Sequence, residues 1–64
     1  MKLIPFSGMM CHPLEITKDG DFKIKGMISR AIDQPALIRY EHFACKEERD
    51  RKYELIVKLL KEDN

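Results

Sequence analysis

The cysteine and histidine residues carry the most distinctive chemistry in this sequence, and they occur as two close pairs. Cys11 and His12 are adjacent, and His42 precedes Cys45 by three residues. Zinc is commonly bound by four thiolate or imidazole ligands, and i,i+3 spacing allows two ligands from one turn. Neighbours on a strand point to opposite faces, so Cys11 and His12 could share one ion only from a loop or bulge. We therefore expect reduced thiols, surface or edge histidines and no metal; a zinc-stapled structural domain is kept as the third hypothesis.

Basic residues near an aromatic ring suggest a second chemistry, the binding of nucleic acid. Lys23, Lys25 and Arg39 are expected to share one face of a sheet, near Phe43. Rings stack on the bases of single-stranded RNA or DNA, and cations hold the phosphates. Three acidic residues are expected on the same face: Glu15, Asp21 and Glu41. The 12 basic and 11 acidic residues leave a net charge of only +1, so bulk charge gives no help and nucleic-acid binding is the alternative hypothesis.

Catalysis has little support in the sequence. His42 and Cys45 are the only local pair of a base and a nucleophile. No oxyanion loop, glycine-rich phosphate cradle or pair of carboxylates accompanies them. A chain of 64 residues also has little volume for a pocket that excludes water. We expect a protein that is not an enzyme and uses no cofactor.

The strongest periodic signal lies in residues 44–63, which we expect to form a C-terminal helix. Four residues fall at i, i+3, i+4 and i+7, the spacing of one helix face: Tyr53, Ile56, Val57 and Leu60. The charge run 46–52 contains i,i+4 pairs with the acid first, which suits the solvated first turns of a helix. Leu55 and Leu59 lie outside the stripe and widen the apolar arc beyond what one small sheet covers.

Two alternating segments around Asp19-Gly20 predict a β-hairpin. A two-residue loop would mix apolar and charged side chains on both faces. A three-residue loop, Lys18-Asp19-Gly20, instead opposes Ile16 to Phe22 and Leu14 to Ile24 and collects one apolar face. We favour the second register, with Gly20 in the left-handed conformation that glycine tolerates.

Further strands are expected on both sides of this hairpin. Residues 2–6 suggest a short strand, placed at a sheet edge by Pro5. Residues 27–32 continue or end the second hairpin strand, with a short helix over 29–32 as an alternative. Asp33-Gln34-Pro35 is typical of a turn. Residues 36–43 are rich in β-branched and aromatic residues and predict a third long strand, with Ile38 and Tyr40 facing the core.

Length and composition limit the fold to one small domain over residues 1–64. We expect an α+β fold with an N-terminal arm or edge strand (1–8), an antiparallel β-meander (9–43) and the covering C-terminal helix (44–63). The meander has three strands, or four with the N-terminal segment. No apolar run is long enough for a signal peptide or a membrane span, and 2 cysteines are too few for a disulfide scaffold. These features favour a cytoplasmic protein without membrane contact.

The leading hypothesis for function is a small protein-interaction module without enzymatic activity. It would act as an adaptor, regulator or inhibitor of a larger protein, or associate as a homodimer. The positive observation is the broad apolar arc of the C-terminal helix, because an uncovered apolar surface favours a partner. The expected contact residues are Phe43, Tyr53, Leu55 and Leu59.

Overall fold

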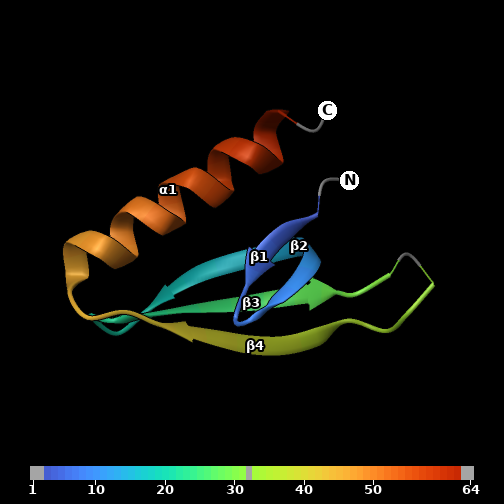
Figure 1. Cartoon of the computed structure of the whole chain (residues 1–64), viewed down its shortest axis with the longest axis horizontal. Helices are drawn as coiled ribbons and strands as arrows, with labels where there is room; N and C mark the ends of the chain where they lie inside the picture. The colour runs from blue at the N-terminus through green and yellow to red at the C-terminus, as the bar shows by residue number, and fades with distance from the viewer. Residues whose placement is uncertain (1–2, 32, 63–64) are drawn as a thin grey trace.

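A computed structural model describes residues 3–31 and 33–62. The fold is α+β: a curled four-stranded antiparallel sheet in the order β1-β2-β3-β4 and one C-terminal helix, α1 (Figure 1). The elements are β1 (Ile4–Phe6), β2 (Met9–Asp19), β3 (Lys23–Ser29), β4 (Leu37–His42) and α1 (Lys46–Glu62). The predicted meander and helix are confirmed, with the N-terminal segment as a fourth strand. The parts of the predictions that concern residues 1, 2, 32 and 63 lie outside the described residues.

A bulge in β2 divides the sheet into two parts. The register of β2 against β3 shifts between Pro13 and Glu15, which leaves Leu14 as the extra residue. Proline has no N–H to donate to a ladder, so a bulge is a favourable place for Pro13. The insertion changes which side chains face inward, so Cys11 and Pro13 are buried on one side of it, whereas Leu14 is exposed. The predicted core position of Leu14 is therefore wrong.

The β1–β2 hairpin folds back over β3 and reaches β4 (Figure 1). Its two-residue turn, Ser7-Gly8, has φ values of 53° and 81°, as expected for a type I′ hairpin turn. The hydroxyl of Ser7 donates to the backbone carbonyl of Tyr40 at 2.8 Å. The ring of Phe6 lies so close to β3 that a Cβ on Gly26 would be 2.8 Å from its Cε2 atom. The hairpin thus covers one face of β3 and contacts the backbone of β4.

The hydrophobic core lies between this hairpin, β3 and α1. Its buried members are Ile4, Phe6, Cys11, Ile24, Ile28 and Ile56. A second group is partly buried against them: Met9, Ile16, Leu37, Phe43, Tyr53, Leu59 and Leu60. The expected helix stripe therefore packs on the core through buried Ile56 and partly buried Tyr53 and Leu60. The sheet contributes Ile24 and Ile16, whereas Phe22, Ile38 and Tyr40 are exposed.

The β2–β3 register differs from the prediction by the position of its loop. The structure opposes Ile16 to Gly26 and Asp19 to Lys23, so the three-residue loop is 20–22 instead of 18–20. Gly20 has φ 63°, as expected, but it begins the loop. The observed register keeps Lys18 in the strand, where its ammonium lies 3.3 Å from Asp50 of α1. The observed register differs from the predicted one by an even number of residues, so the side chains keep their faces. The prediction that Ile16 and Ile24 share a face is confirmed.

The face assigned to β4 is wrong. Tyr40 opposes Lys25 and Ile38 opposes Met27, whereas Arg39 opposes Gly26, over which Phe6 lies. Paired residues share a face, so Ile38 and Tyr40 point away from the core. Leu37 and Phe43 pack against the core instead. Both faces of this strand carry large apolar residues, and the β1–β2 hairpin covers only one of the two faces.

Helix α1 is attached to the β2–β3 turn by a buried arginine. Arg49 is 2% exposed, and its Nη1 atom donates to the carbonyl oxygens of Gly20 at 2.9 Å and Lys23 at 3.2 Å. Its Nε atom donates to Asp50 at 2.7 Å. This hydrogen bond, with Lys18 adding to it, holds the pKa of Asp50 below its ordinary value. The first turn of α1 and the loop between β2 and β3 are therefore joined by hydrogen bonds.

Candidate interaction surface

One face of the sheet is left uncovered by the hairpin and the helix. We call it the open face, and the strand register assigns to it three rows across β2, β3 and β4. The rows are Glu15-Met27-Ile38, Thr17-Lys25-Tyr40 and Asp19-Lys23-His42. Side chains that point to the same side of adjacent strands form a continuous surface. The open face is thus built on one uninterrupted part of the ladder, beyond the bulge in β2.

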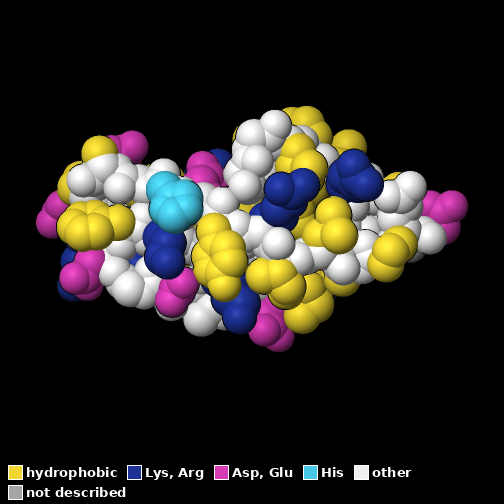
Figure 2. Space-filling model, turned by 90° about the horizontal axis from the view of Figure 1, so that it is seen from below, with side chains coloured by type: hydrophobic (Ala, Val, Ile, Leu, Met, Phe, Trp, Pro, Cys, Tyr) yellow, Lys and Arg dark blue, Asp and Glu magenta, His cyan; other side chains and the backbone are white. Residues whose placement is uncertain are grey.

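Apolar side chains occupy one end of the open face. Ile38 is 51% exposed, Tyr40 is 41% exposed, and Met27 is half-buried beside them. Seen from below, toward the β4 edge, hydrophobic side chains lie among Lys and Arg side chains, with acidic side chains mainly toward the margins; this view includes both sides of β4 (Figure 2). Tyr and Met are enriched in the buried part of protein interfaces, so this apolar end is suited to contact with a partner.

The charges of the open face balance. Lys23 and Lys25 are matched by Glu15 and Asp19, and the Lys23 ammonium lies 3.5 Å from the Asp19 carboxylate. Lys23 also lies 5.3 Å from the centroid of the Tyr40 ring, within the range of a cation–π contact. The face is therefore amphipathic and mixed in charge, without an excess of either sign.

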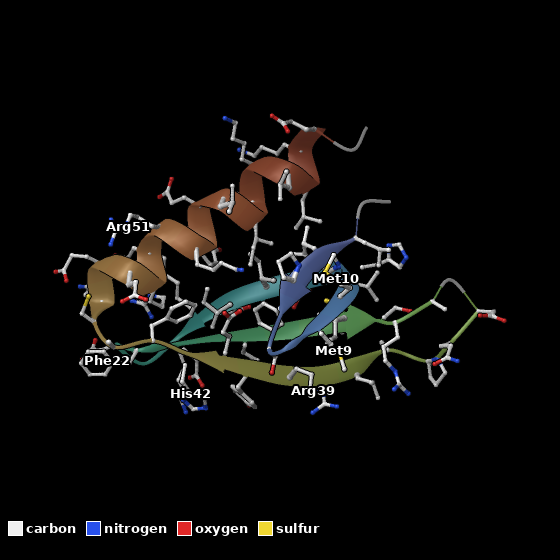
Figure 3. The ribbon with its side chains drawn as sticks, viewed as in Figure 1. Met9, Met10, Phe22, Arg39, His42 and Arg51 are labelled. Carbon is white, nitrogen blue, oxygen red and sulfur yellow. The ribbon has the colours of Figure 1, made fainter. Side chains whose placement is uncertain are left out.

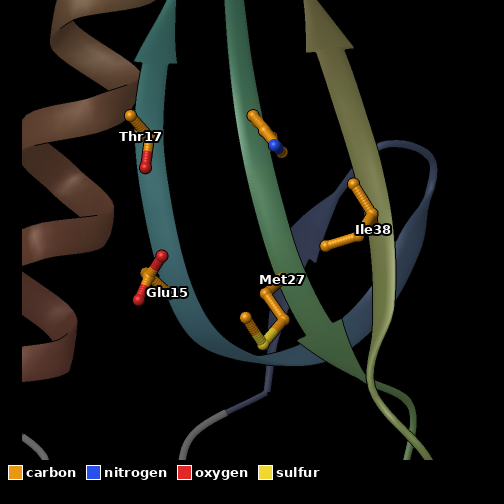
Figure 4. Close-up of a pocket in the computed structure, with 5 residues that line it drawn as sticks. Glu15, Thr17, Met27 and Ile38 are labelled. Atoms are coloured by element: carbon orange, nitrogen blue, oxygen red, sulfur yellow. The ribbon is translucent and has the colours of Figure 1, made fainter.

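A shallow hollow of about 170 Å³ lies on this face (Figure 4). Its lining comes from all three strands: Glu15, Thr17, Lys25, Met27 and Ile38. Pockets for small molecules are usually concave sites of about 300–1,000 Å³, so this hollow is too small for that role. Its size suits a single side chain of a binding partner.

Only some of the residues predicted for nucleic-acid contact lie on the same face of the sheet. Lys23 and Lys25 share the open face, as predicted. Arg39 does not, because it opposes Gly26 and points to the other side of β4. Phe43 is partly buried against the core, and the aromatic side chain beside the two lysines is Tyr40. Of the three acidic residues expected there, Glu15 lies on the open face, whereas Glu41 points to the core side and Asp21 lies in the loop.

The four residues predicted for protein contact differ in how exposed they are. Leu55 is 51% exposed on α1, as the prediction requires. Tyr53, Leu59 and Phe43 are partly buried against the core, so the excess apolar arc is smaller than the sequence suggests. Lys18 also covers the Tyr53 ring, with 5.1 Å from its ammonium to the centroid. Sequence reasoning placed the uncovered apolar surface on the helix, whereas Ile38 and Tyr40, exposed on the same face, lie on the sheet.

The four residues of the zinc hypothesis do not come together. His12 opposes Ser29 and His42 opposes Lys23, so the two imidazoles lie at opposite ends of β3, separated by about 20 Å along the strand. Cys11 is fully buried, and burial raises the pKa of its thiol. Cys45 precedes α1. Within residues 3–31 and 33–62, no three Cys, His, Asp or Glu side chains form a group that could hold a metal ion.

Besides Leu14, Ile38 and Tyr40, sequence reasoning also missed the exposure of Phe22 and Met10. Phe22 is 51% exposed in the β2–β3 loop, although its alternation with Ile24 predicts a core residue. Met10 is 55% exposed on the outer surface of the β1–β2 hairpin, next to Pro5. The Gly20-Asp21 dipeptide before Phe22 is the one signal that could have placed this residue in the loop.

Comparisons with known proteins give no family for this chain. No family model matches it, and neither a curated protein nor a solved structure matches it. Within the described residues, no helix is long and apolar enough to cross a membrane. The functional argument therefore depends on the surface itself.

Proposed function

We propose that the protein is a small, non-enzymatic interaction module that binds a larger protein through the open face of its sheet. The observation that carries this proposal is the apolar group of exposed Ile38, exposed Tyr40 and half-buried Met27 on a face that neither the β1–β2 hairpin nor α1 covers. Exposed apolar side chains beside one another favour burial by a partner, because removing them from water stabilises the complex. An adaptor, regulator or inhibitor acts in this way, by occupying a surface of its partner.

The size of the open face favours a larger partner over a second copy. Three strands about 4.8 Å apart and five or six residues at about 3.3 Å each give a flat footprint of about 300 Å², before the relief of the side chains is counted. A stable complex buries about 800 Å² on each partner. Two copies stacked on this face would bury too little, whereas a larger protein can also contact the surfaces beside it.

Photocrosslinking tests this proposal at single positions. The photoreactive residue benzoylphenylalanine replaces either Ile38 or Leu55, which have the same exposed fraction of 51% and lie on the open face and on the helix, respectively. After irradiation in the cells that naturally make this protein, we expect a discrete protein adduct at position 38 and none at position 55. The purified adduct partner should bind the intact chain, and Ile38→Asp should weaken that binding at least tenfold. An adduct at position 55 alone would move the interface to the helix, and no protein adduct at either position would contradict the proposal.

Nucleic-acid binding is the second candidate, and the contact between Lys23 and the Tyr40 ring favours it. Together with Lys25, this pair places two cations and an aromatic ring on one exposed sheet face. Bases can stack on such a ring while ammonium groups contact phosphates. Glu15 and Asp19 on the same face oppose this function, which is why it ranks second.

The salt dependence of binding tests the second candidate. If the open face binds nucleic acid, a random single-stranded oligonucleotide should bind with an affinity that falls steeply as salt is raised. The Lys23→Glu/Lys25→Glu double variant should then abolish binding, whereas Lys58→Glu, an exposed lysine of α1, should not. Absence of binding at low salt would reject this function.

A further inference from the structure

We propose that Phe22 is a pre-organised anchor that inserts into an apolar pocket of the partner protein, and that the partner carries a basic side chain at the rim of that pocket. This inference rests on the proposed function and adds a second contact at the end of the open face. Phe22 lies in the β2–β3 loop directly before Lys23, whose row also contains His42, so the anchor stands at the end of the sheet where the open face ends. Figure 3 shows Phe22 and His42 at the same end of the sheet, with the Phe22 ring directed outward from the loop.

The backbone on both sides of Phe22 and at Phe22 itself is held by hydrogen bonds. Arg49 donates to the carbonyl of Gly20 on one side of Phe22 and to the carbonyl of Lys23 on the other. The backbone N–H of Phe43 donates to the carbonyl of Phe22 itself, at 2.8 Å. Two hydrogen bonds therefore hold the three-residue loop itself, and a third holds the first residue of β3 directly after it.

This arrangement leaves the ring exposed while its backbone is fixed. Phe22 is 51% exposed, although an apolar ring gains nothing from contact with water. An aromatic residue with two side-chain torsions on a rigid backbone loses little conformational entropy when it binds. Such residues are the usual energetic centres of protein interfaces when they enter a pocket of the partner.

The charge beside Phe22 indicates the chemistry of the pocket rim. Asp21 is exposed, and among the described residues it makes no ion pair, whereas the neighbouring Asp19 is paired with Lys23. An unpaired carboxylate next to an apolar anchor is complementary to a lysine or arginine of the partner. It also disfavours a phosphate backbone at this end of the molecule, so we assign the anchor to a protein partner.

The experiment uses the intact chain and compares two residues of equal exposure. Benzoylphenylalanine at position 22 is irradiated in the cells that naturally make this protein, and the crosslinked partner is identified and purified. Its affinity is then measured for the wild-type chain and for Phe22→Ala, Phe22→Leu, Asp21→Lys and Leu55→Ala. Leu55 is the matched control because it is also 51% exposed. The urea unfolding of each variant shows whether the fold is retained.

We expect one protein adduct at position 22 that maps to apolar residues of the partner. Phe22→Ala should weaken binding at least thirtyfold, Phe22→Leu less than Phe22→Ala, and Leu55→Ala less than twofold. Asp21→Lys should slow association at least threefold, since it reverses the charge that faces the rim. Binding within twofold of wild type for Phe22→Ala, no protein adduct at position 22, or an adduct to nucleic acid would each overturn the anchor.

The result separates this inference from the proposed function. If Ile38→Asp abolishes binding and Phe22→Ala leaves it unchanged, the open face is the interface and the anchor is wrong. If neither substitution changes binding, the open face and the anchor are both wrong. If both substitutions weaken binding while the unfolding transition is retained, the open face and the loop form one continuous interface.

Discussion

At the scale of single residues, the contact between Phe6 and Gly26 determines how the hairpin sits on the sheet. A Cβ at position 26 would lie 2.8 Å from Phe6 Cε2 and 3.0 Å from its Cζ atom. Gly26 is buried in the middle of β3, so its missing side chain provides the space in which the ring lies. Glycine is therefore required here by close packing, not by its backbone angles.

Gly26→Ala should lower the free energy of unfolding by about 1–3 kcal/mol, the usual cost of inserting a methyl group into a packed core. Urea unfolding followed by circular dichroism measures this change. Lys25→Ala, at the neighbouring exposed position, should change the free energy by less than about 0.5 kcal/mol. Equal effects of the two substitutions would show that Phe6 is not packed against position 26.

The two cysteines differ in their environment, and this predicts different reactivity. Cys11 is fully buried and burial raises the pKa of its thiol, so the reactive thiolate is disfavoured. Cys45 is partly exposed before the helix. Iodoacetamide at pH 8 should therefore alkylate Cys45 at least tenfold faster than Cys11, as measured by mass spectrometry of peptides.

In urea above the unfolding transition, the two alkylation rates should become similar, because both thiols are then exposed. The raised pKa of Cys11 also has a consequence for stability. The folded state favours the neutral thiol. Its contribution to the free energy of unfolding is therefore fully present below the ordinary thiol pKa of 9.0 and is lost as the pH rises through the higher folded-state pKa. Fast alkylation of Cys11 in the folded protein would contradict its position in the core.

At the scale of elements, the buried Arg49 joins α1 to the loop between β2 and β3. Arg49→Ala leaves the carbonyls of Gly20 and Lys23 without their donor, and should destabilise the fold by about 1–3 kcal/mol. Arg51→Ala is the matched control, because Arg51 is exposed and points outward from α1 (Figure 3). Urea unfolding of the two variants measures the difference.

A second measurement on the Arg49→Ala variant separates the hydrogen bond from simple packing. The bond to Arg49 is the main reason that the pKa of Asp50 is lowered. Removing it should raise this pKa, which NMR titration of the carboxyl carbon detects, whereas Arg51→Ala should leave it unchanged. An unaltered pKa would mean that Arg49 does not bond to Asp50 in solution.

Sequence reasoning predicted the elements well and the connections between their faces less well. The periodicity of residues 53–60 and the alternation of β2 and β3 are local properties, so the helix and the strands could be predicted. The bulge at Leu14 could not, because nothing in the alternation of side chains marks an inserted residue. Both faces of β4 carry apolar residues, so the sequence of this strand alone does not determine which face is buried. The buried face is the one that the β1–β2 hairpin covers when it folds over Gly26. The exposed face, and with it the candidate interface, follows from that event.

At the scale of the whole molecule, two features act against self-association. The open face of about 300 Å² is small for a stable dimer, which needs about 800 Å² from each chain. The free edge of β4 could pair with another strand, but the carbonyl of Tyr40 already accepts a hydrogen bond from Ser7. The hairpin turn thus blocks the middle of this edge.

We therefore expect the purified chain to be a monomer at micromolar concentration, and sedimentation velocity measures this directly. Ser7→Ala removes the hydroxyl that covers the β4 edge, so it should increase association. The matched change Thr17→Ala, which removes a hydroxyl from the open face, should not. A wild-type dimer that Ile38→Asp dissociates would instead make the open face a self-association surface. A dimer that only Leu55→Asp dissociates would place the interface on α1, where the sequence first suggested it. The monomer is the outcome that the small open face and the Ser7 hydrogen bond at the β4 edge favour.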